Sequence, residues 1–176
     1  MPSLLHKQRN LALLIDADNA SHHLTRALLH RAACYGVLRV KRAYADWSRP
    51  QLRNYKALLQ RFAIEPVHTY RHATGKNSAD ILMTIQAIEL MNMGLLDGVC
   101  IGSSDSDFTH LAIRLRLEGL DVYGFGARQT PQAFVQACTR FFYLEDLEAS
   151  SPGQQVFHKP RLRRHRQVAP ARKDKA

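Results

Sequence analysis

Two periodicities alternate along the chain. Short continuous apolar runs are typical of strands buried on both faces of a sheet. Between them, apolar residues recur every three or four positions, as on one face of a helix. The pattern predicts strands over residues 11–15, 37–44, 64–70, 99–101, 121–125 and 140–144, and helices over 24–35, 52–62, 77–93, 108–118 and 131–138.

This strict alternation of strand and helix predicts the fold class. It is typical of a parallel sheet with helices on both faces, an α/β, three-layer, Rossmann-like domain. Pro66 lies inside the third expected strand and indicates an edge position, because proline cannot donate a ladder hydrogen bond. With 176 residues, 45% of them hydrophobic, the chain is long enough for one well-buried core, which we assign to residues 1–150.

Five aspartates are expected to meet at one edge of this sheet. Asp16 and Asp18 end the first strand in LLIDADNA, Asp105 and Asp107 follow the fourth in IGSSDSDF, and Asp80 lies in the first turn of the helix between them. In open α/β sheets, sites lie beyond the carboxyl ends of the strands where the strand order reverses. If the first and fourth strands are neighbours at that point, these carboxylates converge.

Each aspartate also has a simpler interpretation. Asp80, Asp105 and Asp107 could cap or favour helix N-termini, and Asp18 could belong to a turn. Capping needs one acceptor for each helix, however, whereas Asp16-x-Asp18 and Asp105-x-Asp107 each supply two. Crowded carboxylates repel one another, and a hard divalent cation removes that penalty. Oxygen ligands without a cysteine cluster favour Mg²⁺ or Mn²⁺.

The formal charge of +10 is concentrated at the C-terminus. Residues 151–176 hold eight Lys or Arg and one Asp, a formal +7, which leaves +3 for the first 150 residues. With few large apolar residues, this segment is predicted to be a disordered basic tail that attracts polyanions such as RNA. A solubilising tail remains the alternative. The cations of this segment that we expect to contact RNA are clustered: Lys159, Arg161, Arg163, Arg164 and Arg166.

The remaining composition bears on location. No apolar run approaches the roughly 20 residues of a membrane span, and we expect neither a signal peptide nor a membrane partner. The three cysteines, Cys34, Cys100 and Cys138, each lie among apolar residues, which predicts buried thiols in a reducing compartment such as the cytoplasm. A homodimer is compatible with the sequence but not specified by it.

The ordered motifs IDADNA, RAYADW, GKNSAD, SSDSDF, VYGFG and TPQAF resemble the NYN domain, in its bacterial LabA-like branch within the PIN-like nuclease superfamily. The resemblance covers about residues 11–147. It implies RNA cleavage at a metal site formed by Asp16, Asp80, Asp105 and Asp107. It further implies that Asn19 steadies that site by hydrogen bonding, with Ser103 or Ser104 acting from the opposite side; Asp18 is less firmly part of the pattern.

Other side chains are candidates for RNA contact. Lys76 and Arg71 precede Asp80 in a glycine-containing loop where they could hold phosphates, although ordinary surface cations would look the same. Tyr44 and Trp47 could stack a base or pack in the core. Two other functions stay open: an RNA-binding adaptor with a vestigial site, and a haloacid-dehalogenase-type phosphatase with Asp16 as the nucleophile.

Overall fold

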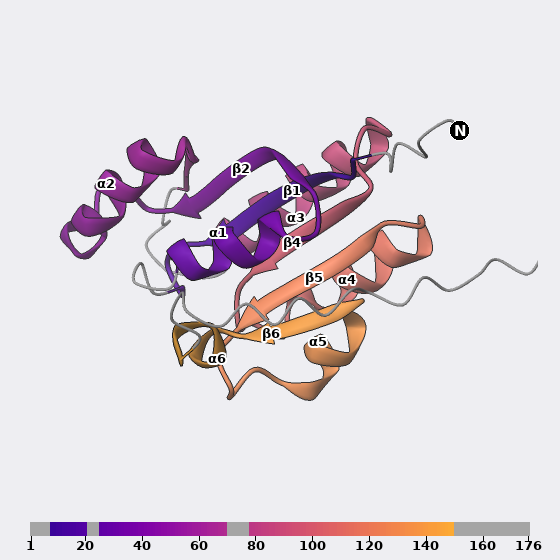
Figure 1. Cartoon of the computed structure of the whole chain (residues 1–176). Coiled ribbons are helices and arrows are strands. Elements are labelled where there is room, and N and C mark those ends of the chain that lie inside the picture. The colour runs from indigo at the N-terminus through magenta and orange to yellow at the C-terminus, as the bar shows by residue number, and fades with distance from the viewer. Residues whose placement is uncertain (1–7, 21–24, 70–77, 150–176) are drawn as a thin grey trace, which may run out of the picture.

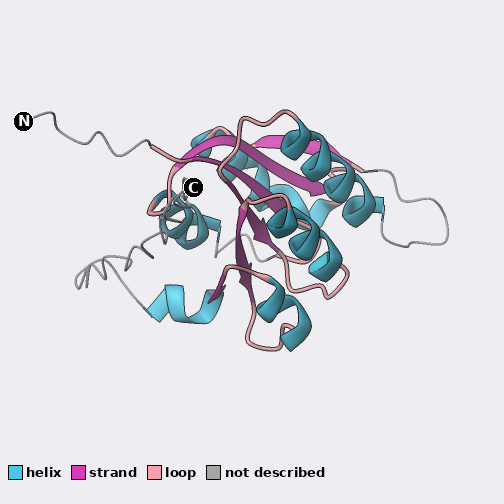
Figure 2. Ribbon diagram, turned by 90° about the vertical axis from the view of Figure 1, so that its right-hand side faces the viewer, coloured by secondary structure: helices cyan, strands magenta, loops and turns pink. Residues whose placement is uncertain are grey.

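The computed structural model describes residues 8–20, 25–69 and 78–149. Its centre is a sheet of six parallel strands in the order β3-β2-β1-β4-β5-β6 (Figures 1 and 2). The strands are β1 (Asn10–Asp16), β2 (Val37–Ala45), β3 (Glu65–His68), β4 (Gly98–Gly102), β5 (Asp121–Gly126) and β6 (Arg140–Tyr143). The helices are α1 (Thr25–Ala33), the short 3-10 helix η2 (Pro50–Leu52), α2 (Arg53–Phe62), α3 (Ser78–Asn92), α4 (Phe108–Leu117), α5 (Gln132–Ala137) and α6 (Leu144–Ala149).

Helices cover both faces of the sheet, as the alternation predicts. Successive residues of β1 point to opposite faces, so Leu13 packs in one buried cluster and Leu14 in the other. The cluster with Leu14 is completed by α3, α4 and α5, and the cluster with Leu13 by α1, α2 and α6. The α/β three-layer prediction is therefore confirmed.

The strand order reverses beside β1. The chain runs outward from β1 through β2 to β3, then returns through α3 and runs outward again from β4 through β5 to β6. Ile15 near the end of β1 pairs with Gly102 at the end of β4, so the loops that leave these two strands begin side by side. This is the crevice at which ligands bind in open α/β sheets. β3, with Pro66, lies at one edge as expected.

Leu144 and Cys34 differ from the sequence predictions, and the structure decides between the two alternatives left open for Tyr44. Leu144 begins α6 rather than ending the last strand, because LEDLEA closes a helical turn whose Leu144 is buried. Cys34 is exposed, whereas Cys100 and Cys138 are buried as predicted. Tyr44 is fully buried, and its hydroxyl donates to Oε1 of Gln86 at 2.8 Å, so it is a core residue that cannot stack a base. None of the helices in the described ranges is long and apolar enough to cross a membrane.

Candidate active site at the β1–β4 edge

Asp16 is the last residue of β1 and is held from two sides. Its side chain is 1% exposed. Oδ2 accepts hydrogen bonds from Nδ2 of Asn19 at 2.8 Å and from Oγ of Ser103 at 3.0 Å. Burial raises the pKa of Asp16, and these hydrogen bonds act against that rise by favouring the ionised form. The two hydrogen bonds therefore orient the carboxylate, but they do not fully offset the cost of burying its negative charge.

Ser103 connects the two acidic strand ends. Its hydroxyl donates to Asp16 and accepts the backbone N–H of Asp105 at 3.1 Å. Oδ1 of Asp105 in turn accepts the backbone N–H of Asp107 at 2.9 Å, which fixes the turn into α4. Asp107 takes the N-cap position of α4 without capping the helix through its side chain. Simple capping therefore does not account for the Asp107 carboxylate.

The neighbouring Ser104 has a different task. Its hydroxyl accepts the backbone N–H of Ala127 at 2.8 Å and thereby ties the loop after β4 to the loop after β5. A Cβ at Gly126 would lie 2.8 Å from the carbonyl oxygen of Ser103 and 2.6 Å from Oγ1 of Thr130. The VYGFG motif thus ends in a glycine because β5 passes too close to the site for a side chain.

Asp80 faces the same edge from α3. Burial, followed by the nearby charges of Asp16, Asp105, Asp107 and Asp18, raises the pKa of Asp80 to about 6. Four other carboxylates act on this one side chain, so the five aspartates do share one electrostatic environment. The helix places Asp80 in its first turn, as the sequence predicts.

Asp18 forms an ion pair with a cation from another loop. Oδ1 of Asp18 accepts from a guanidinium nitrogen of Arg49 at 2.6 Å, and both side chains are partly buried. Arg49 lies in the turn between β2 and η2, 31 residues away in sequence. It was not among the predicted site residues, because no local pattern links a turn arginine to an aspartate on another loop.

Whether these residues suit a divalent cation can be judged from their unused oxygens. Oδ1 of Asp16 and Oδ1 of Asp80 are both buried and have no hydrogen-bond partner among the described residues. A buried carboxylate oxygen without a partner is costly, and an oxygen-seeking cation would satisfy it. Within the described ranges, no three His, Cys, Asp or Glu side chains are grouped closely enough to hold a metal ion as they stand. The donor chemistry fits Mg²⁺ or Mn²⁺, and the carboxylates would have to draw together to bind it.

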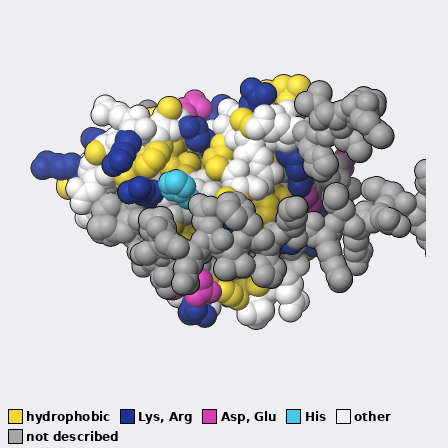
Figure 3. All heavy atoms as spheres, viewed as in Figure 1, with side chains coloured by type: hydrophobic (Ala, Val, Ile, Leu, Met, Phe, Trp, Pro, Cys, Tyr) yellow, Lys and Arg dark blue, Asp and Glu magenta, His cyan; other side chains and the backbone are white. Residues whose placement is uncertain are grey.

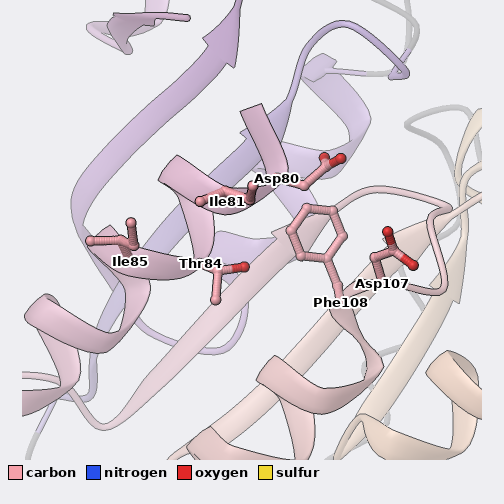
Figure 4. Close-up of a pocket in the computed structure, with 6 residues that line it drawn as sticks. All are labelled: Asp80, Ile81, Thr84, Ile85, Asp107 and Phe108. Atoms are coloured by element: carbon pink, nitrogen blue, oxygen red, sulfur yellow. The ribbon is translucent and has the colours of Figure 1, made fainter. Parts of the chain in front are cut away.

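An apolar pocket adjoins the acidic edge (Figure 4). It has a volume of about 270 Å³ and is lined by Asp80, Ile81, Thr84, Ile85, Asp107 and Phe108. In the view of Figure 4, Asp80 lies above the Phe108 ring, Asp107 to its right, and Ile81, Thr84 and Ile85 of α3 to its left. The pocket was not predicted, because its isoleucines belong to a helix whose apolar residues were expected to be core.

The predicted RNA contacts are only partly visible. Trp47 is half-buried; its indole N–H donates to the carbonyl oxygen of Val67 at 3.0 Å, and its ring meets Tyr55 edge-on. Arg71, Lys76 and the tail cations Lys159, Arg161, Arg163, Arg164 and Arg166 lie outside the described residues. On the face drawn in Figure 3, Lys and Arg side chains are spread over the described surface among apolar ones.

Comparison with known families identifies this α/β domain. The NYN domain matches residues 10–145. The chain therefore belongs to the NYN domain family, which is part of the PIN-like nuclease superfamily. The family prediction is confirmed at this level.

One solved structure shows the same fold. A protein of unknown function from Vibrio parahaemolyticus RIMD 2210633 is 21% identical, with a TM-score of 0.67, over 84% of this chain and 98% of that one. A putative NADPH-dependent oxidoreductase from Desulfitobacterium hafniense DCB-2 is 9% identical, with a TM-score of 0.41, over 78% of this chain and 35% of that one, which is too distant to bear on function. No curated protein matches the chain.

Proposed function

We propose that this chain is a metal-dependent ribonuclease of the LabA-like branch of NYN domains. Asp16, Asp80, Asp105 and Asp107 would hold Mg²⁺ or Mn²⁺, and RNA would be cleaved at the edge where β1 and β4 end. The observation that carries the proposal is the pair of buried carboxylate oxygens on Asp16 and Asp80 that have no partner in the described part of the chain, in a domain of the PIN-like nuclease superfamily. When bound, the cation would lower the pKa of an attacking water and offset the charge that builds on the scissile phosphate.

The chain's own residues prepare this edge for a cation. Ser103 and Asn19 both donate hydrogen bonds to Oδ2 of Asp16, which leaves Oδ1 without a hydrogen-bond partner among the described residues. Asp80, with a pKa of about 6, is mostly ionised above neutral pH, and the described groups that act on it, four other aspartates, repel its charge. Arg49 compensates Asp18 and keeps that carboxylate from adding fully to the repulsion. In this account Asp18 and Asn19 support the site and do not act on substrate.

RNA would be held by cations around this edge. We infer that Lys76 and Arg71 contact phosphates next to the site and that Lys159, Arg161, Arg163, Arg164 and Arg166 add sequence-independent affinity. Trp47 keeps a role in RNA contact only through the part of its ring that Tyr55 and β3 leave exposed. We further infer a reducing compartment such as the cytoplasm, because Cys34, Cys100 and Cys138 are all free thiols.

The test of this function is nucleolysis by the purified full chain. Labelled single-stranded RNA, duplex RNA and DNA of the same sequence are incubated with Mn²⁺, with Mg²⁺ or with EDTA. We expect RNA cleavage with either metal and none with EDTA. If RNA stays intact with both metals, this proposal is wrong.

Two other functions are separated by different readouts. An RNA-binding adaptor with a vestigial site would bind RNA but would show no Mn²⁺ binding by calorimetry. A phosphatase using Asp16 would form an adduct on that residue, which mass spectrometry after a phosphodonor pulse would detect. The near-complete burial of Asp16 and the NYN match favour the nuclease over the phosphatase.

A further inference from the structure

Large apolar side chains are exposed beside the acidic edge. Ile81 and Ile85 of α3 are 58% and 49% exposed and lie one helical turn apart on the wall of the pocket. Each acidic residue that lines the pocket is followed in the sequence by an apolar residue that also lines it: Asp80 by Ile81, and Asp107 by Phe108. An exposed apolar surface continuous with a candidate site is unexpected if that site handles phosphates alone.

The shape and chemistry of the pocket restrict its occupant. Its 270 Å³ is just below the range of about 300–1,000 Å³ that holds drug-sized ligands, so it suits one small ring system. The carboxylates of Asp80 and Asp107 in its lining disfavour an anion such as phosphate inside the pocket. Ile81 and Ile85 offer exposed apolar contact, Phe108 lines the pocket as a fully buried core ring, and the Thr84 hydroxyl offers one hydrogen-bonding group. A flat, uncharged heteroaromatic ring fits this lining.

We propose that the pocket between α3 and α4 binds one unpaired nucleobase of the RNA, on a nucleotide next to the scissile phosphate. This inference rests on the proposed ribonuclease function and adds how the substrate is selected. A base can enter the pocket only when it is neither paired nor stacked in a duplex. The pocket therefore makes an unpaired nucleotide at the cleavage position a requirement for turnover.

Base binding is measured first without cleavage. The full chain, with isoleucine methyl groups labelled for NMR, is titrated in EDTA with adenosine, with uridine and with ribose as the base-free control. We expect saturable shifts of the Ile81 and Ile85 methyl signals with the nucleosides but not with ribose. The Ile113 methyl, on the neighbouring helix α4 and 43% exposed but outside the pocket, stays unchanged. Equal shifts with ribose, or none with nucleosides, overturn the proposal.

Turnover supplies the second test. Ile85→Ala is expected to raise KM for single-stranded RNA about tenfold, as the loss of one base contact would. With the wild type, an oligonucleotide that has an abasic site at the affected position should show the same rise in KM. With Ile85→Ala, the abasic site should raise KM no further. Ile113→Ala is the matched control and should leave KM unchanged. Equal KM values for the two isoleucine variants contradict base binding here.

Two remaining outcomes are distinguishable. If a second copy of the chain covers this face, sedimentation shows a dimer and the Ile81, Ile85 and Ile113 methyl signals all shift with protein concentration, which overturns the proposal. If nucleosides shift Ile81 and Ile85 but no RNA is cleaved with Mn²⁺ or Mg²⁺, the ribonuclease function fails while the pocket remains a base-binding site.

Discussion

The hydroxyl of Ser103 donates to Oδ2 of Asp16 at 3.0 Å, and both side chains are almost completely buried. The two residues lie 87 positions apart and meet because β1 and β4 are neighbours where the strand order reverses. The same hydroxyl accepts the N–H of Asp105, so one side chain sets the relative position of both halves of the acidic edge. Ser103 is therefore the residue through which the fold positions the site.

Replacing Ser103 with alanine tests this role. Removing a hydrogen bond to a buried carboxylate should lower the free energy of unfolding by about 2 kcal/mol. Loss of a positioning partner should also lower metal affinity or activity about 10- to 100-fold. Chemical denaturation and Mn²⁺ calorimetry give the two values. Ser106→Ala, at an exposed serine of the same loop, is the control and should change neither; equal effects of the two variants would refute the positioning role.

Asp80→Asn is expected to stabilise the protein without divalent cations. The folded-state pKa of Asp80, about 6, exceeds the unfolded value of 3.8, so the folded state binds the proton more tightly. The wild type therefore loses stability as the pH rises from about 4 through 6, and asparagine does not titrate. Because the side chain is only half-buried, solvent screening reduces the effect to about 1 kcal/mol at pH 7.5.

Thermal unfolding of both proteins in EDTA between pH 4 and pH 8 measures this difference. The melting temperatures should converge near pH 4 and separate above pH 6, with the variant higher. Adding Mn²⁺ should raise the melting temperature of the wild type more than that of Asp80→Asn, because a ligand stabilises the state that binds it. A variant that is less stable than the wild type at pH 7.5 in EDTA would contradict the carboxylate repulsion.

The Arg49–Asp18 ion pair should stabilise the folded protein more than an ordinary surface ion pair does. Its partners are separated by 2.6 Å and partly buried, whereas the Arg114–Glu118 pair at 2.7 Å is exposed. A double-mutant cycle with Arg49→Gln and Asp18→Asn is expected to give a coupling energy of about 1–2 kcal/mol, and the cycle on Arg114 and Glu118 about 0.5 kcal/mol. Equal coupling in the two cycles would show that Asp18 does not need compensation.

The tail is expected to contribute affinity but not chemistry. Ending the chain at Ser150 removes +7 of the formal +10 charge and leaves every described site residue in place. RNA binding should weaken at low salt and its salt dependence should flatten, by about 0.7 in log–log slope for each lost phosphate contact on single strands. Turnover at saturating RNA should stay the same. An unchanged affinity and slope would make the tail a bystander, and a loss of cooperative melting would move the domain boundary beyond residue 150.

The sequence predicted most of the fold because strands buried on both faces leave continuous apolar runs, as in LALLI before Asp16 and GVCIG before Ser103. The convergence of Asp16, Asp80 and Asp105 could be expected from topology alone, since the carboxyl ends of neighbouring parallel strands share one edge. Features that depend on the exact direction of the backbone could not be predicted from the sequence. Ser103 and Ser104 are adjacent and chemically identical, and only the path of the chain after β4 decides which one meets Asp16.

Ion pairs between distant residues and the solvent exposure of single side chains could not be predicted from the sequence either. Arg49 occupies a turn with no periodic pattern, so its contact with Asp18 follows only from how two loops pass each other. Ile81 and Ile85 belong to a helix that is apolar on nearly every side, so periodicity could not show which face the sheet covers. The exposure of Cys34 was missed for the same reason, since among its apolar neighbours in α1 Ala32 is buried whereas Ala33 is exposed.

The most direct test of the central claim is single-turnover cleavage by Asp105→Asn, measured with RNA binding in the same samples. The account predicts that cleavage in Mn²⁺ falls by at least about 100-fold while RNA binds as tightly as before or more tightly, because the lost carboxylate no longer repels phosphate. Glu118→Gln, which removes a surface carboxylate of α4 outside the acidic edge, should behave like the wild type. An Asp105→Asn protein that cleaves RNA at the wild-type rate would show that the acidic edge is not the catalytic site.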